Sequence, residues 1–229
     1  MPDPTPQIFN HFALVRFTDG YWSEPPESRR RRLCTWLESL RGAVGALHLY
    51  QTFGVEAASD LIVWSAIEGE DLGIPGRFFT RFAESVAPLR RHLTLRTALW
   101  GFTQPSQYTK TRSRQEIDPF APERLPYLVM YPFTKTAEWY QRDHEQRRGM
   151  MMEHIKIGKQ FEDITQLLLY STGLQDQEFV VVYETHDLPR FSDLVTELRR
   201  TAARPYTERD TPLHTAIHQS GPDALARWL

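Results

Sequence analysis

A histidine within the sequence MMMEHIKIGKQF has the clearest potential for chemistry. At helical spacing, His154 shares one stripe with Met150, Ile157 and Phe161, so it lies in the middle of an apolar face. A histidine there is either a core residue hydrogen-bonded to the backbone or a metal ligand. Neutral imidazole is the usual protein ligand of haem iron. Gly158, one turn further on, leaves space for a flat macrocycle to approach the helix.

A tyrosine and a lysine flank a proline in the segment YPFTK. Alternation along a strand places Tyr131 on one sheet face with Tyr127, Val129 and Phe133. Proline cannot donate to the ladder, so this strand lies at an edge or ends here. A tyrosine on an inner face is either core or catalytic. Lys135, just after the strand, is by itself typical of a surface position.

Gln166 is a polar residue in a strongly apolar strand, because three leucines follow it directly. A buried amide without partners costs about 1–3 kcal/mol. We therefore expect Gln166 to be buried and to contact either a structural partner or a ligand.

Other kinds of site have no support. The remaining histidines show neither HExxH nor a short Cys/His spacing, and no GxGxxG, P-loop or GxSxG occurs. The net charge of -2 gives no indication of a general nucleic-acid binder. The run Arg29–Arg32 precedes an apolar pattern at helical spacing and reads as the solvated start of a helix. The histidines in question are His11, His48, His92, His144, His186, His214 and His218.

The sequence predicts a protein of the cytoplasm. Cys34 is the only cysteine, so no internal disulfide is possible and a reducing compartment fits. The stretch Met1–Gln7 lacks the apolar region of a signal peptide. No run of 18 apolar residues predicts a membrane span. With 229 residues, 41% of them hydrophobic, the chain can bury a sizeable core.

The elements that must position these residues repeat one order twice, strand-helix-strand-strand-helix-strand. In the first half we expect strands at 12–17, 47–53, 61–67 and 93–102 and helices at 26–40 and 75–89. In the second half we expect strands at 127–133, 165–171, 179–184 and 205–217 and helices at 136–161 and 189–200. The polar, proline-containing stretch 103–122 reads as a linker between the halves.

This order predicts an α+β fold of two ferredoxin-like β-α-β-β-α-β repeats with antiparallel sheets. We expect the halves at residues 1–115 and 124–229, the second of them binding the ligand. The strand at 165–171 is apolar on both sides, which is typical of a sheet packed on a sheet. Two sheets face to face would make a dimeric α+β barrel with room for a flat ligand.

Several ordered motifs of the second half resemble the chlorite dismutase superfamily, and within it the coproheme decarboxylase branch. They are YPFTKTAEWY at 131–140, RRGMMMEH at 147–154, YSTGLQDQEF at 170–179 and YTERDTP at 206–212. The match covers about 90 residues. It consists of several motifs in the same order, which is more specific than a single motif. The first half matches weakly, mainly at SQYT, residues 106–109.

The resemblance implies a role for each matching residue. His154 matches the proximal iron ligand, and Gln166 resembles the distal site, where chlorite dismutases have arginine. Tyr131 matches a tyrosine that decarboxylases oxidise to a radical near a propionate, and Lys135 matches a lysine that contacts a propionate. The remaining residues implied to contact the cofactor are Tyr108, Trp139, Met151 and Gly158.

The implied activity is the peroxide-dependent decarboxylation of two propionates of coproheme III, which gives haem b. One departure bears on it, because Ala202 stands where the family has a glutamate that accepts a hydrogen bond from the proximal histidine. Such carboxylates fix the histidine tautomer and tune the iron. The alternatives are a non-catalytic haem or porphyrin carrier, a chlorite dismutase, and a barrel protein that binds no haem.

Partners are implied only by analogy. Coproheme III and hydrogen peroxide would be the reactants, and a ferrochelatase would supply the iron porphyrin. Family members with a long first half are typically homopentamers, and the same state is expected here. No nucleic acid and no membrane span is expected.

Overall fold

A computed structural model describes residues 7–108, 113–220 and 224–229 of the chain. Thr109 of the SQYT match, and Met1–Pro6 of the proline-rich start, lie outside the described residues. Within the described residues, no helix is both long and apolar enough to cross a membrane.

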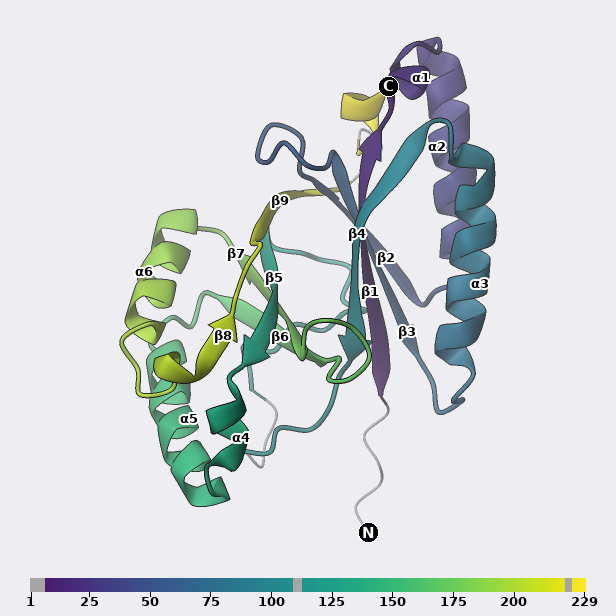
Figure 1. The fold of residues 1–229 in the computed structure, drawn as a ribbon. Coiled ribbons are helices and arrows are strands. Elements are labelled where there is room, and N and C mark those ends of the chain that lie inside the picture. Colours follow the sequence, from purple (N-terminus) through teal and green to yellow (C-terminus); the bar gives the residue numbers. More distant parts are fainter. Residues whose placement is uncertain (1–6, 109–112, 221–223) are drawn as a thin grey trace. The chain divides into compact units, whose positions relative to one another are not determined.

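The chain forms two compact units (Figure 1). The first holds residues 1–102, 119–122 and 215–229, and the second holds residues 103–118 and 123–214. This differs from the expected division at 115 and 124. The reason is the last strand, β9 (His214–Gln219), which pairs antiparallel with β2 (Ala46–Gln51) of the first unit.

The first unit has the predicted β-α-β-β-α-β order, and its sheet runs β4-β1-β3-β2 with antiparallel pairs. Besides β2, its strands are β1 (Ile8–Phe17), β3 (Leu61–Glu68) and β4 (Leu93–Phe102). Its helices are α1 (Asp19–Trp22), α2 (Pro26–Arg41) and α3 (Ile74–Val86), with short 3-10 turns η1 (Ala87–Leu89) and η3 (Ala226–Trp228).

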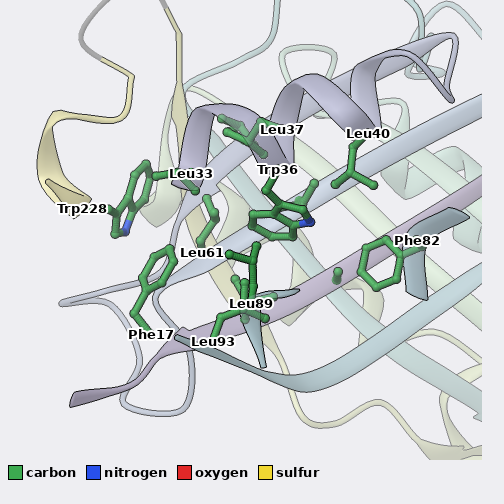
Figure 2. Packing of buried hydrophobic residues seen from close by; sticks show 14 of the residues in the cluster. Phe17, Leu33, Trp36, Leu37, Leu40, Leu61, Phe82, Leu89, Leu93 and Trp228 are labelled. Carbon is green, nitrogen blue, oxygen red and sulfur yellow. The ribbon is translucent and has the colours of Figure 1, made fainter. Parts of the chain in front are cut away.

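The helix-facing side of this first sheet is filled by its own side chains (Figure 2). Helix α2 starts with Pro26 at its first turn, where a missing N–H costs nothing, and buries Leu33, Trp36, Leu37 and Leu40 at helical spacing. On β1, His11 lies 4.9 Å from the ring centroids of Phe78 and Phe82. Burial lowers the pKa of His11 to about 3. This unit therefore has a closed core.

The second unit repeats the order, and its sheet runs β6-β7-β5-β8. Its strands are β5 (Tyr127–Lys135), β6 (Thr165–Tyr170), β7 (Phe179–Thr185) and β8 (Thr207–Arg209). Its helices are α4 (Ala137–Gln141), α5 (His144–Gly158), α6 (Leu188–Leu198) and the 3-10 turn η2 (Arg204–Tyr206). The predicted α+β class with two ferredoxin-like repeats is confirmed.

Two predicted elements of this unit are each split in two. The helix expected at 136–161 breaks after α4, because Asp143 caps a new helix by accepting the N–H of Gln146 at 2.8 Å. The strand expected at 205–217 becomes β8 and β9, because Pro212 between them has no N–H for a ladder. Between β6 and β7, Gly173 has a φ of +75°, a backbone conformation that favours glycine.

Candidate functional site

The helix-facing side of the second sheet is a grid of three cross-strand rows. The strand registers give the rows Gln166–Tyr183–Val129, Leu168–Val181–Tyr131 and Tyr170–Phe179–Phe133, each running from β6 through β7 to β5. Helices α5 and α6 lie on the same side of this sheet (Figure 1). Val129 and Tyr183 of the first row pack with Phe191 and Leu194 of α6, which closes that end of the grid.

Among the described residues, none fully covers the middle of this grid. Leu168 is 43% exposed and Gln166 is also exposed, whereas Leu167 and Leu169, on the other side of β6, are buried. The expectation that Gln166 is a buried amide is therefore wrong. Its backbone is paired, since its N–H donates to Gln115 and its carbonyl accepts from Ile117. The side chain itself is left on an open apolar surface, which is the property of a ligand site.

Helix α5 presents a half-buried stripe made of Arg147, Met151, His154 and Gly158, at i, i+4, i+7 and i+11. None of the fifteen residues of α5 is fully buried, whereas α6 buries Phe191 and Leu194. A Cβ placed on Gly158 would meet no atom within 4 Å among the described residues. The helix therefore leaves space beside this stripe, as expected for Gly158.

His154 is held as a neutral imidazole. Burial, with a smaller contribution from the charge of the nearby Lys135, lowers its pKa to about 4, although Glu153 acts in the opposite direction. Its Nδ1 is buried and has no hydrogen-bond partner among the described residues. Among the described residues, His154 is therefore not a core histidine whose Nδ1 is hydrogen-bonded to the backbone. A neutral ring suits metal ligation.

Ala202 lies beside α5. Its N–H donates to Oε2 of Glu153 at 3.0 Å, so the carboxylate next to His154 in sequence is used to hold this loop. Ala202 and Glu153 also line a hollow of about 440 Å³ together with Met150 and Tyr206. The methyl group of residue 202 cannot supply an acceptor to the imidazole, in agreement with the sequence analysis.

Tyr131 lies in the middle row of the grid, and its hydroxyl shares a hydrogen bond with that of the buried Tyr183. The two ring centroids are 6.4 Å apart with an interplanar angle of 28°. Burial raises the pKa of Tyr131 well above 10, and Tyr183 adds to the shift. The phenol is therefore protonated over the whole physiological pH range.

Lys135 is held at the end of β5 by aromatic rings and a carboxylate. Its Nζ is 4.3 Å from the ring centroid of Trp139 and 5.0 Å from that of Phe133. Its backbone N–H donates to Glu178 Oε2 at 2.8 Å. Burial lowers the pKa of Lys135 to about 8, which Glu178 opposes. A largely desolvated ammonium of this kind is a strong partner for an anionic group.

A cluster of tyrosines surrounds Arg147 at the start of the α5 stripe. The ring of Tyr108 stacks on that of His144 at 6.2 Å. Burial raises the pKa values of Tyr108, Tyr140 and Tyr170, and the charge of Arg147 lowers those of the first two. Tyr140 also shares a hydrogen bond with Glu178. Together these groups offer hydroxyls and a cation to a ligand with carboxylates.

The structure thus brings most of the predicted site residues together in the second unit. Lys135 lies near His154 and contacts Trp139, and Tyr131 and Gln166 belong to neighbouring rows of the grid. Sequence reasoning missed Arg147, Tyr140 and Tyr183. The spacing of Arg147, seven residues before His154, is the one signal that could have revealed it.

Comparisons with known proteins identify the relatives of this chain. The family model described as chlorite dismutase matches residues 27–219. The coproheme decarboxylase of Mycolicibacterium smegmatis is 26% identical over 78% of this chain and 75% of its own. The chlorite dismutase of Ideonella dechloratans is 26% identical over 89% and 73%.

Solved structures agree on the fold. The chlorite dismutase of Candidatus Nitrospira defluvii in complex with imidazole has a TM-score of 0.79 at 23% identity. The similarity covers 96% of this chain and 94% of that one. Because the family model spans most of the sequence, this chain belongs to the chlorite dismutase family.

Proposed function

We propose that the protein is a haem-type enzyme that decarboxylates coproheme III with hydrogen peroxide. The observation that carries the proposal is an exposed apolar part of the sheet, with Leu168 and Tyr131, on the side where α5 carries the half-buried His154. The names of the Mycolicibacterium relative and of a Staphylococcus saprophyticus relative, 28% identical over 73% of this chain, support the same reaction.

The residues present fit an iron porphyrin. A neutral imidazole with a buried, unpaired Nδ1 (within the described residues) is suited to bind iron through Nε2. The open space at Gly158 and the exposed Leu168 offer flat apolar walls. Lys135, Arg147 and the tyrosines supply cations and hydroxyls for carboxylates.

Coproheme is the substrate, and when bound it supplies the iron that reduces peroxide. This chain's own residues would position it: His154 would hold the iron, and Lys135 and Arg147 would hold propionates. Tyr131 would give up one electron and its phenolic proton, and the radical would take a hydrogen atom from the propionate next to it. The absence of an arginine at Gln166 argues against chlorite as substrate, since a distal cation would stabilise that oxyanion.

The overall change balances for each propionate. The side chain loses CO2 and two electrons and becomes a vinyl group. One peroxide takes those electrons and becomes two waters, with the protons coming from the substrate and the solvent. Two such rounds give haem b.

A second candidate is a haem or porphyrin carrier without catalysis. The observation in its favour is that Nδ1 of His154 has no carboxylate partner in the described part of the chain. Such a partner normally makes the ligand imidazole a stronger donor.

Addition of coproheme III to the purified protein, followed by stepwise peroxide and mass analysis, tests the proposal. Two successive losses of a carboxyl group with loss of hydrogen are expected. Tight binding without a mass change would favour the carrier, and oxygen release on adding chlorite would favour a dismutase. Either result would overturn the proposed reaction.

A further inference from the structure

A buried tyrosine lies directly behind Tyr131. Tyr183 on β7 is fully buried, whereas Tyr131 is half-buried at the edge of the open part of the grid. Tyr183 stands in the row next to that of Tyr131, so the two rings are diagonal neighbours on adjacent strands. Diagonal neighbours of this size lie within reach of one another, and their hydroxyls share a hydrogen bond.

The scaffold around Tyr183 is rigid. Its ring centroid is 5.2 Å from that of Phe191 on α6, and Val129, Ile164 and Leu194 belong to the same buried cluster. By contrast, Leu168, in the same row as Tyr131, is exposed. Tyr183 and the buried cluster to which it belongs therefore pack against one side of the Tyr131 ring.

We propose that Tyr183 is a positioning residue that fixes the hydroxyl of Tyr131 in both of its oxidation states. A phenol hydroxyl is both donor and acceptor, and its proton rotates. While Tyr131 is intact, the two hydroxyls share one hydrogen bond, in which either can be the donor. Once Tyr131 has lost an electron and a proton, Tyr183 can turn its own O–H toward the radical oxygen.

This inference rests on the proposed function, which makes Tyr131 the group that is oxidised. Tyr131 regains a hydrogen atom from the propionate, so over one round the electrons and protons that reach the peroxide come from the substrate and the solvent. Tyr183 keeps its own proton and is not consumed. Tyr183 provides the radical oxygen with a hydrogen-bond partner. Without one, a polar atom in an apolar surrounding is costly.

The test compares Tyr183→Phe, which removes only the hydroxyl, with wild type. Tyr127→Phe, an equivalent change at the start of β5, is the matched control. We expect coproheme affinity to stay within about twofold and the decarboxylation rate to fall by about tenfold or more. High-field EPR of the radical formed with peroxide should show a changed g-tensor in Tyr183→Phe only, because that tensor reports hydrogen bonding to the phenoxyl oxygen.

Wild-type rate and an unchanged radical spectrum in Tyr183→Phe would overturn the inference. If that variant fails to fold, ENDOR of the wild-type radical prepared in H2O and in D2O tests the inference instead. An exchangeable proton coupled to the radical is expected, and its absence would refute the role of Tyr183. Tyr131→Phe is measured alongside. Normal turnover by Tyr131→Phe removes the proposed mechanism together with this inference, whereas an inactive Tyr131→Phe beside a normal Tyr183→Phe removes this inference alone.

Discussion

Tyr131 and Leu168 lie in one cross-strand row of the second unit's sheet, with Val181 between them. Tyr131 is half-buried and Leu168 is 43% exposed, so this row runs from the packed part of the unit into an uncovered apolar surface. A large flat ligand that covers Leu168 would therefore lie against Tyr131. The predictions below follow from this relationship and from the groups around it.

Filling the uncovered surface should block binding without harming the fold. Leu168→Trp places a large ring where the porphyrin would lie, so the coproheme dissociation constant should rise tenfold or more, about 1.4 kcal/mol. Because Leu168 is exposed, the free energy of unfolding should change by only about 0.5 kcal/mol. Leu95→Trp, at a residue of the first unit that is 42% exposed, is the matched control and should bind normally. Equal binding by both variants would place the ligand elsewhere.

Removing the hydroxyl of Tyr131 should separate binding from chemistry. Tyr131→Phe should bind coproheme with wild-type affinity, since the ring and its packing remain. Its decarboxylation rate should fall about 100-fold or more, which corresponds to about 2.7 kcal/mol. Mass analysis after peroxide addition measures this, and normal turnover would rule out Tyr131 as the oxidised group.

The affinity for a carboxylate-bearing substrate should depend on Lys135. Its pKa is lowered to about 8. The side chain is therefore charged below about pH 8 and loses its charge as the pH rises through this value. Coproheme binding by wild type should therefore weaken between about pH 7 and pH 9. Lys135→Gln should bind weakly at every pH, whereas Lys135→Arg should lose the pH dependence and keep the charge. A wild-type profile in Lys135→Gln would contradict the assignment.

His11 should make the stability of the protein depend on pH. Its pKa falls from 6.5 to about 3 on folding, so the unfolded chain binds an extra proton between these values. The contribution of the neutral His11 to the free energy of unfolding is fully present above about pH 6.5. It decreases by about 1.4 kcal/mol per pH unit as the pH falls toward 3. Between pH 7 and pH 5, wild type should lose about 2 kcal/mol more than His11→Leu. Urea unfolding at both pH values measures this difference, and parallel losses would show that His11 is not the cause.

The repeated β-α-β-β-α-β order was predictable because strands such as β3 are short apolar runs and helices such as α2 bury residues at a period of 3.6. The break before Asp143 was not, since residues 141–149 contain no apolar residue whose spacing could mark a boundary, and only the side-chain cap of Asp143 starts a new helix there. The pairing of β9 with β2 was also hidden, because a strand pattern does not name its partner.

Within the site, His154 and Tyr131 were found because a polar group on an apolar stripe or strand stands out. The prediction that Gln166 is buried was wrong because it relied on the neighbouring residues in sequence. Its leucine neighbours suggested burial, but in the unit as it stands one side of β6 is left open. Tyr183 was missed because its importance comes from a cross-strand diagonal, which requires the strand register.

The central claim is that the imidazole of His154 binds the iron of a porphyrin lying on this sheet face. Resonance Raman spectroscopy of the ferrous coproheme complex, prepared with natural and 15N-labelled histidine, tests it most directly. We predict an iron–nitrogen stretching band that shifts with the label and disappears in His154→Ala. A band that persists in His154→Ala, or a complex with no histidine-sensitive band, would contradict the account.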